Sequence, residues 1–212
     1  MANSDQDCVL VYVVRHGQTV LNAQNAFRGS KNVPLDDTGK ADAQNLANIF
    51  KNVDVSHIIS SDRIRAKSTA AAIASKKHQP VHTTENLRAL DVGKFSGEKR
   101  NQENIDALQH YIDNPDETIP GGESLNAFKS RIDPCLSEAI DLAIESGEPV
   151  LLVAHSSVVH EVGAMLKNEH KAVLVKPGGY AVIYINDRGQ VDAKPVYRPD
   201  NERMKQHAET IS

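Results

Sequence analysis

The stretch from Val9 to Gly17 reads Val-Leu-Val-Tyr-Val-Val-Arg-His-Gly, and it decides which fold the sequence predicts. A continuous apolar run, rich in β-branched residues, stops abruptly at Arg15, His16 and Gly17. Such a run is typical of a strand buried on both faces, as in a parallel α/β sheet. In open α/β sheets, ligands bind beyond the carboxyl ends of the strands, so Arg15 and His16 are expected where chemistry is done.

A second apolar run, Val150 to Ala154, ends in the same way at His155. If the two strands are neighbours, the imidazoles of His16 and His155 face each other across the crevice. A lone histidine at the end of a strand is more often structural than functional. Two of them, one beside an arginine whose planar guanidinium suits phosphate, favour a functional site.

Composition limits the classes of protein to consider. The 212 residues are 40% hydrophobic and 25% charged, which allows one sizeable core, and we expect a single domain over residues 1–212. The net charge of -4 lacks the basic balance of a duplex-binding protein. Trp is absent and aromatic residues make up 4%, which argues against stacking on single strands, so no nucleic-acid partner is expected.

The amino-terminal sequence predicts neither a membrane partner nor a signal peptide. The segment 1–7 is polar, and the apolar run behind it is too short to span a membrane and lacks a basic region and a cleavage site. We therefore expect a cytoplasmic protein. The cysteines are Cys8 and Cys135, too few for a disulfide framework, and Cys8, at the start of an apolar strand, is expected to be a buried free thiol.

Strand and helix patterns alternate along the chain, as in βαβ units. They predict a three-layer α/β/α sandwich with a mainly parallel central sheet. After the first strand, the expected strands are 57–60, 81–84, 150–154, 180–185 and an antiparallel edge strand at 191–196. The expected helices run from 38 to about 51, from 61 or 62 to about 77, from 101 to 112, from 123 to a stop at 147–149, and from 156 or 157 to about 166.

Polar residues with N-cap character place the starts of three of these helices. Thr38 is the expected cap of the first helix. Ser61 or Asp62 is the expected cap of the second, and Ser156 or Ser157 of the last.

Further expectations concern the helix interiors and the end of the chain. The second helix is expected to turn Ile64, Ala71 and Ala72 inward. Pro134 is expected to kink or divide the long helix, because its ring removes a backbone donor. The segment 199–212 is expected to be a polar, frayed tail.

Four short motifs together resemble the histidine phosphatase (phosphoglycerate mutase-like) superfamily. They are Arg15-His16-Gly17-Gln18-Thr19 with Asn22, Pro34-Leu35 and Thr38-Gly39; Ser60-Ser61-Asp62-Arg63-Ile64-Arg65-Ala66 with Thr69-Ala70; Pro120-Gly121-Gly122-Glu123-Ser124; and Val153-Ala154-His155-Ser156. The resemblance covers roughly residues 8–186, and the combination is specific although each motif alone is weak. It implies a phosphoglycerate mutase-like fold.

The resemblance implies a role for each matched residue. His16 matches the family's nucleophile, which accepts the phosphoryl group on a ring nitrogen and is competent only when neutral. Arg15 and Arg65 match its phosphate-clamping arginines, and Arg65 is expected in the first turn of its helix, where the helix dipole also favours an anion. His155 matches the second histidine, which holds the transferring phosphoryl oxygens, and Asn22 matches a further phosphate-binding side chain.

The sequence departs from the family pattern at the proton donor. The family usually reads Leu-Arg-Glu at this point, whereas this chain reads Leu87-Arg88-Ala89, and Ala89 cannot donate a proton. General-acid catalysis is worth about 10²–10⁴ in rate, so either another carboxyl substitutes or poor leaving groups turn over slowly. Asp91 is the first candidate acid and equally a loop-capping aspartate. Glu123 is the second, and is more readily a first-turn helix glutamate.

No cofactor and no metal are expected. His155 and His160 are five residues apart, roughly 140° around a helix, and do not share a face. No Gly-x-Ser-x-Gly elbow surrounds Ser156, and the sequence contains no P-loop, so a serine hydrolase and a nucleotide-binding protein are both disfavoured.

The resemblance implies a metal-independent phosphatase of the histidine acid phosphatase type, which hydrolyses a small phosphomonoester through a phosphohistidine at His16. The short span from Gly97 to His155 favours a phosphatase over a mutase, because mutases of the family tend to carry larger insertions there. Two alternatives stay open: phosphoglycerate mutase-type phosphoryl transfer, and a degenerate member that binds a phosphorylated ligand without efficient turnover, which Ala89 favours. Residues 98–120 are expected to form a lid-like insertion that selects the substrate, and the sequence leaves the oligomeric state open.

Overall fold

The computed structural model describes residues 8–167, 175–186 and 188–196, so the tail predicted at 199–212 lies outside the described residues. In chain order the elements are β1 (Cys8–Arg15), α1 (Val20–Ala23), α2 (Asp37–Ile49), the short 3-10 helix η1 (Phe50–Asn52), β2 (His57–Ser61), α3 (Ile64–Lys77), β3 (His82–Thr84), the short 3-10 helix η2 (Gly93–Phe95), α4 (Gln102–Asp113), α5 (Leu125–Ser146), β4 (Val150–Ala154), α6 (Ser156–Lys167), β5 (Tyr180–Ile185) and β6 (Val191–Val196).

The sheet has the strand order β3-β2-β4-β1-β5-β6. β1 is parallel to β4, β4 to β2 and β2 to β3, whereas β5 runs antiparallel to β1 and β6 antiparallel to β5. The predictions of a mainly parallel sheet and of an antiparallel edge strand at 191–196 are confirmed. Arg15 of β1 lies opposite Ala154 of β4, so the next residues of both strands, His16 and His155, leave the sheet side by side.

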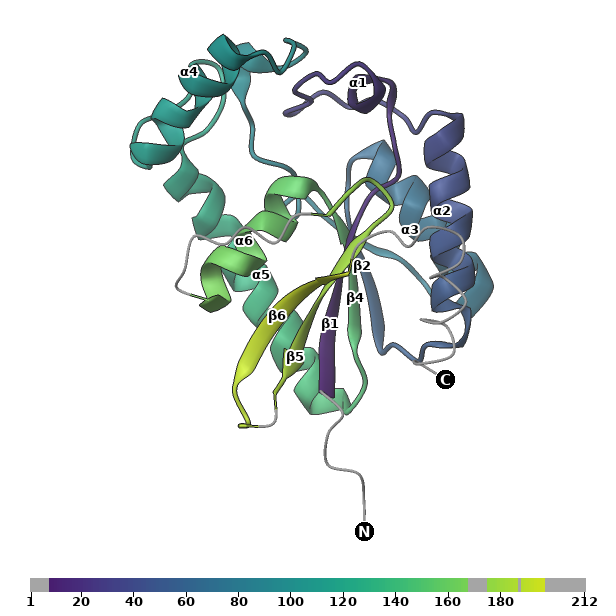
Figure 1. The fold of residues 1–212 in the computed structure, drawn as a ribbon. Helices are drawn as coiled ribbons and strands as arrows, with labels where there is room; N and C mark the ends of the chain where they lie inside the picture. The colour runs from purple at the N-terminus through teal and green to yellow at the C-terminus, as the bar shows by residue number, and fades with distance from the viewer. Residues whose placement is uncertain (1–7, 168–174, 187, 197–212) are drawn as a thin grey trace.

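Helices cover both faces of the sheet, which confirms the three-layer α/β/α architecture. Figure 1 shows α2 and α3 on one face and α5 and α6 on the other. The buried strand β1 contributes alternate residues to the two resulting cores. Val11 and Val13 pack with apolar side chains of α5 and α6, whereas Tyr12 and Val14 pack with those of α2 and α3.

Two segments stand above the carboxyl end of β1. Figure 1 shows α1 and α4 at this end of the molecule, outside the three layers. The chain around residues 25–28 pairs antiparallel with residues 97–100: Phe27 N–H donates to the Glu98 carbonyl at 2.8 Å, and Gly97 N–H donates to the Phe27 carbonyl at 2.7 Å. We call residues 25–28 and 97–100 the rim ribbon. α4 begins after Asn101, close to the predicted position.

The helix caps differ from the sequence predictions. Asp36, not Thr38, caps α2, because its Oδ1 accepts the Gly39 N–H at 2.8 Å. The predicted cap of α3 is also wrong, since α3 follows Arg63, and Ser61 and Asp62 are instead engaged by side chains from elsewhere in the chain.

The helix that follows β4 begins at Ser156, directly after His155. Ser156 and Ser157 therefore lie inside α6 rather than before it, and their prediction as caps is wrong. The Ser157 hydroxyl instead accepts the backbone N–H of Leu90 at 3.0 Å, which ties the loop after β3 to the start of α6.

The predicted burial is wrong at Ile64, Ala71 and Cys8, and the division of the long helix, one of the two outcomes predicted for Pro134, does not occur. Ile64 and Ala71 are exposed. The buried face of α3 instead contains residues at helical spacing, namely Arg65, Ala66, Thr69, Ala70, Ile73 and Ala74. Cys8 is a free thiol but is exposed, since β1 becomes buried only further along its length. Pro134 does not divide the long helix: α5 is continuous through it, with Ile132 and Leu136 buried on either side.

Within the part of the chain that the structure describes, no helix combines the length and the apolar character needed to cross a bilayer.

The N-cap assignment of α2 gives a matched pair of substitutions. Asp36→Ala should lower the free energy of unfolding by about 1 kcal/mol, because the Gly39 N–H loses its acceptor. Thr38→Ala should change the free energy by less than about 0.5 kcal/mol, because Thr38 is exposed inside the helix. Urea denaturation followed by circular dichroism measures both values. A larger loss for Thr38→Ala than for Asp36→Ala would contradict the cap assignment.

Candidate active site

The two histidines meet at the carboxyl ends of β1 and β4. Their ring centroids are 5.2 Å apart, and the rings are inclined by 65°. Both residues are buried, with 0% of His16 and 1% of His155 exposed. The His16 N–H donates to the Ala154 carbonyl at 3.1 Å, which continues the strand pairing one residue past the sheet. The expectation that the imidazoles face each other is confirmed.

The tautomer of His16 is fixed by its neighbour. Nδ1 lies 2.6 Å from the Gly17 carbonyl oxygen, which can only accept, so Nδ1 carries the proton and Nε2 keeps its lone pair. Arg65 Nε donates to that Nε2 at 3.2 Å. Burial, with the positive charges of Arg28 and Arg65 and the neighbouring ring of His155, holds the pKa of His16 well below its usual value of 6.5. His16 is therefore a neutral imidazole with an available lone pair.

Arg65 is held rigidly rather than solvated. It lies in the first turn of α3, is fully buried, and donates from Nη1 to the Lys31 carbonyl at 2.7 Å and from Nη2 to the Gly29 carbonyl at 3.4 Å. Burial, together with the charge of Arg28, lowers its pKa to about 9. Its guanidinium is thus a fixed positive group beside Nε2 of His16.

His155 has one engaged and one open ring nitrogen. Nε2 lies 2.9 Å from the Ser61 hydroxyl, while Nδ1 is buried and makes no hydrogen bond to any described residue. Burial lowers the pKa of His155 well below 6.5, and the charges of Arg65, Arg28, Arg63 and Arg131 lower it further. An unpartnered polar atom in such a position is suited to a ligand oxygen.

Arg15 is the second of the two arginines that the sequence predicts to bind phosphate. Its Nη1 donates to the Val175 carbonyl at 2.7 Å, and its buried Nε has no partner among the described residues. Burial, with the charge of Arg100, lowers its pKa to about 10.

Sequence reasoning missed Arg28. This half-buried side chain acts electrostatically on His16, His155 and Arg65, and burial with the charges of Arg15 and Arg100 lowers its own pKa to about 9. One signal was present: Arg28 is the sole charged residue between positions 17 and 30.

Asn22 is the one predicted phosphate ligand that the structure engages elsewhere. Its Oδ1 accepts from the backbone N–H of Thr19 at 3.1 Å and from the Thr19 hydroxyl at 3.0 Å, as part of a capping box at the start of α1. Its contacts therefore stabilise the turn that follows His16.

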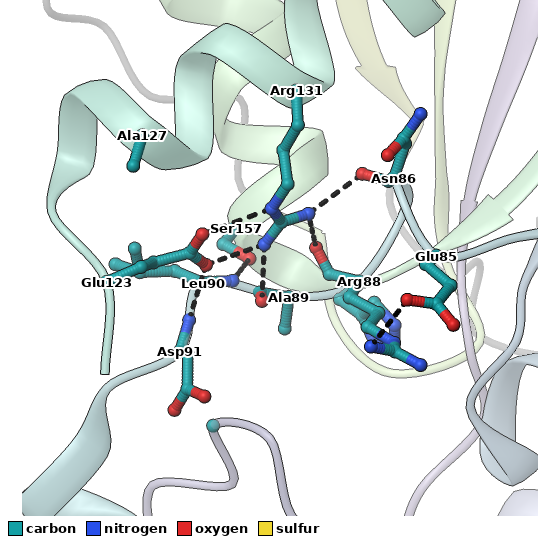
Figure 2. Close-up of polar contacts among 12 residues, drawn as sticks. Glu85, Asn86, Arg88, Ala89, Leu90, Asp91, Glu123, Ala127, Arg131 and Ser157 are labelled. Atoms are coloured by element: carbon teal, nitrogen blue, oxygen red, sulfur yellow. Dashed lines mark hydrogen bonds and ion pairs between the residues drawn. The ribbon is translucent and has the colours of Figure 1, made fainter. Parts of the chain in front are cut away.

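The two carboxyl candidates differ in their surroundings. Glu123 forms a bidentate ion pair with Arg131, at 2.6 Å from Nη2 and 3.1 Å from Nε, and also accepts the Asp91 N–H at 2.8 Å. Figure 2 shows the Asp91 carboxyl pointing away from this pair. Asp91 Oδ1 accepts the Gly93 N–H at 3.1 Å, which is the contact of a loop-capping aspartate. Glu123 is consequently a structural residue.

Arg131 also fixes the loop that contains Ala89. Its guanidinium donates to the carbonyls of Asn86 and Arg88, both at 2.8 Å, and of Ala89 at 3.0 Å (Figure 2). The stretch that holds the proton donor in the family is thus rigidly placed next to the start of α6, but carries a methyl group at position 89.

The charges around the two histidines have one sign. Every charged side chain that shifts the pKa of His16 or His155 is a cation. Among the described residues, no ion pair involves Arg15, Arg28 or Arg65. An arrangement of fixed guanidinium groups around a neutral imidazole is suited to binding a multiply charged anion and attacking it with a nitrogen lone pair.

This geometry is suited to binding a phosphoryl group, and the comparisons with known proteins point to the same class of site. The sequence model of the histidine phosphatase superfamily (branch 1) matches residues 11–177, and the chain belongs to this superfamily. The resemblance noted from the motifs is therefore confirmed.

Similar proteins include both mutases and phosphatases by name. The probable phosphoglycerate mutase GpmB of Salmonella choleraesuis (strain SC-B67) is 34% identical over 154 residues, which cover 68% of this chain and 68% of that protein. The structure of phosphoglycerate mutase from Bacillus anthracis str. Sterne has a TM-score of 0.75 at 23% identity, over 97% of this chain and 99% of that one. A mycobacterial glucosyl-3-phosphoglycerate phosphatase in complex with VO3 has a TM-score of 0.73 at 23% identity, over 89% and 98%. These two structural matches show a shared fold.

The lowered pKa values of the two histidines predict a stability that falls in acid. Below pH 6.5 the unfolded chain protonates His16 and His155, whereas the folded state keeps both neutral. The unfolded state then binds more protons, so the stability present above pH 6.5 is lost as the pH falls, with a slope approaching about 2.7 kcal/mol per pH unit for two protons. Urea unfolding at several pH values between about 7.5 and 5.5 measures this slope.

Single substitutions at the two histidines separate their contributions. His16→Asn and His155→Asn should each remove about half of the slope, because each removes one proton from the balance. An unchanged slope in both variants would show that the histidines do not cause the acid sensitivity.

Proposed function

We propose that this chain is a phosphatase that hydrolyses a small phosphomonoester through a phosphohistidine at His16, without a metal ion. The observation that supports this most directly is the anchoring of His16 Nδ1 on the Gly17 carbonyl, which leaves Nε2 unprotonated beside Arg65. A nucleophile held in that form needs no base to activate it.

The first step forms a bond between His16 Nε2 and phosphorus and breaks the bond from phosphorus to the leaving oxygen. The leaving oxygen takes the electron pair of the broken bond. Arg65 and Arg15 hold the non-bridging oxygens, and Nδ1 of His155, which is buried and unpartnered among the described residues, donates to one of them. Fixed donors around these oxygens supply most of what phosphoryl transfer requires.

The second step releases phosphate. A water oxygen attacks phosphorus, the bond to Nε2 breaks, and its electron pair returns to the ring. The rigid fork of Arg65, held by the Lys31 and Gly29 carbonyls, keeps the phosphoryl group in line during both steps. Asn22 contributes by stabilising the turn after His16, through its capping-box contacts with Thr19.

The proposed first step also needs a proton donor for the leaving oxygen of an alkyl ester. Ala89 has no proton to donate, and Glu123 is paired with Arg131. Asp91 is therefore the candidate acid, and it must release the Gly93 N–H before it can act as one. Residues 98–120, which include α4 at the same end of the molecule as the strand ends, are proposed as the lid that selects the substrate (Figure 1).

The runner-up is a phosphoglycerate mutase, which the 34% identity to the Salmonella protein favours. The two activities differ in one requirement: a mutase needs priming by a bisphosphoglycerate, whereas a hydrolase does not. A degenerate phosphoryl-binding protein is the third possibility, and Ala89 is the residue that favours it.

Leaving-group quality gives the test of the proposed phosphatase. An aryl phosphate such as p-nitrophenyl phosphate should turn over, and an alkyl phosphate such as glycerol phosphate should lag by about 10²-fold or more in kcat/KM, because only the alkoxide needs a proton. His16→Asn should abolish turnover, while His82→Ala, an exposed histidine on β3, should leave it unchanged. Phosphate release is measured without added bisphosphoglycerate.

Each alternative makes a different prediction in the same assay. Failure of both esters, with tight binding of vanadate, would favour the degenerate binder. Turnover that appears only after priming would favour the mutase. Equal rates for both esters would show that a general acid is present after all.

A further inference from the structure

The site contains more positive charge than one phosphoryl group requires. Arg15 and Arg65 serve the transferred group in the function proposed above. The half-buried Arg28 and the exposed Arg100 add positive charge nearby, since Arg28 lowers the pKa of Arg65 and Arg100 lowers the pKa values of Arg15 and Arg28. No carboxylate forms an ion pair with Arg28 or Arg100 within the described ranges. Unneutralised guanidinium groups repel one another, so the arrangement is explained best by an anion that they share.

The two arginines lie on the two paired segments of one ribbon, with Arg100 opposite Asn25 and Arg28 three residues further along. Both belong to the rim ribbon, in which Arg100 N–H donates to the Asn25 carbonyl at 2.9 Å. The Arg100 guanidinium lies over the ring of Phe27, with its central carbon 4.6 Å from the ring centroid. This contact holds the Arg100 side chain back toward the strand that carries Arg28.

The loop after Arg28 lies against Arg65, beside the nucleophile, and against the segment that follows Ala89. We call the side of the site at this segment the leaving-group side, because the family's proton donor belongs there. Gly29 has its carbonyl on Arg65, while a Cβ built on Gly29 would meet the Ser96 hydroxyl at 2.2 Å and a methyl of Val92 at 2.8 Å. The backbone at Gly29, the residue next to Arg28, therefore lies between Arg65 and the segment that follows Ala89.

The carboxyls near this side are already in use. Asp62 is held by Arg88, Glu123 by Arg131, and Asp91 accepts the Gly93 N–H. The leaving-group side thus offers cations where a proton donor would stand.

We propose that the substrate is a phosphoanhydride, whose leaving group departs as a phosphate anion that Arg28 and Arg100 neutralise without protonation. This inference rests on the phosphatase function proposed above and names the substrate class for it. A diphosphate group carries charge on both phosphates, and four guanidinium groups, from Arg15, Arg65, Arg28 and Arg100, match it.

The step balances without an acid. His16 Nε2 bonds to the terminal phosphorus, the bridging oxygen takes the electron pair of the P–O bond, and the leaving phosphate departs with that charge. Water then hydrolyses the phosphohistidine, which releases a second phosphate and returns the electron pair to Nε2. Charge developing on the bridging oxygen is stabilised by the guanidinium of Arg28.

The experiment compares three substrates on the full chain in the presence of EDTA, which silences contaminating metal-dependent pyrophosphatases. The substrates are inorganic diphosphate, p-nitrophenyl phosphate and glycerol phosphate. Diphosphate should be hydrolysed faster than glycerol phosphate. Arg28→Met should lower kcat/KM for diphosphate by about 10²-fold and for p-nitrophenyl phosphate by less than about tenfold, because the leaving phosphate depends on that charge more than the transferred group does.

Matched variants keep the result interpretable. Arg28→Lys keeps the charge and should recover part of the diphosphate activity, while Arg188→Met removes an exposed arginine between β5 and β6 and should change nothing. Ala89→Glu should raise glycerol phosphate turnover and lower that of diphosphate, because it adds a proton donor and also a negative charge. Circular dichroism and thermal unfolding establish that each variant is folded.

Three results would overturn the inference. Equal losses for both substrates in Arg28→Met would mean that Arg28 binds the transferred phosphoryl group. Turnover of p-nitrophenyl phosphate without turnover of diphosphate would exclude the phosphoanhydride and leave the phosphatase proposal standing. Turnover of neither substrate would remove both proposals.

Discussion

The structure depends on a concentration of positive charge around a buried, neutral imidazole. His16 and His155 are brought together by the parallel register of β1 and β4, and the guanidinium groups of Arg28 and Arg65 act electrostatically on both of them. Desolvated cations beside one another are unfavourable, so this arrangement stores free energy that a bound anion releases. The site is thus organised for an anion before one arrives, which is what electrostatic catalysis requires.

Hydrogen bonds to backbone carbonyl oxygens stabilise these buried side chains. The Gly17 carbonyl accepts from His16 Nδ1. The carbonyls of Lys31 and Gly29 accept from the Arg65 guanidinium, and the Val175 carbonyl accepts from that of Arg15. A carbonyl oxygen satisfies a guanidinium N–H without cancelling its charge, unlike a carboxylate. Outside this centre the pattern reverses, because the pair of Glu123 and Arg131 is fully neutralised and serves to hold a loop. The contrast separates the residues proposed to bind the ligand from the residues that position backbone.

Much of the fold and the centre of the site could be predicted from sequence, because they follow from local patterns. Apolar runs that end in histidine at His16 and His155 identify both buried strands and the edge where they meet. The sequence contains only a weak signal for Arg28, its isolation as a charged residue, since its position comes from the pairing of two loop segments distant in sequence. The caps were misplaced for a related reason: at Ser61, tertiary contacts compete with capping for the same hydroxyl.

Detection of the covalent intermediate tests the nucleophilic role proposed for His16. The protein is mixed with an aryl phosphate, quenched in base within the first turnovers, and examined by intact mass and peptide mapping, because phosphohistidine survives base but not acid. A nucleophilic His16 should gain the mass of one phosphoryl group, which should be absent from the His16→Asn variant. Steady turnover with no phosphorylated histidine, or a phosphoryl group on another residue, would contradict this role.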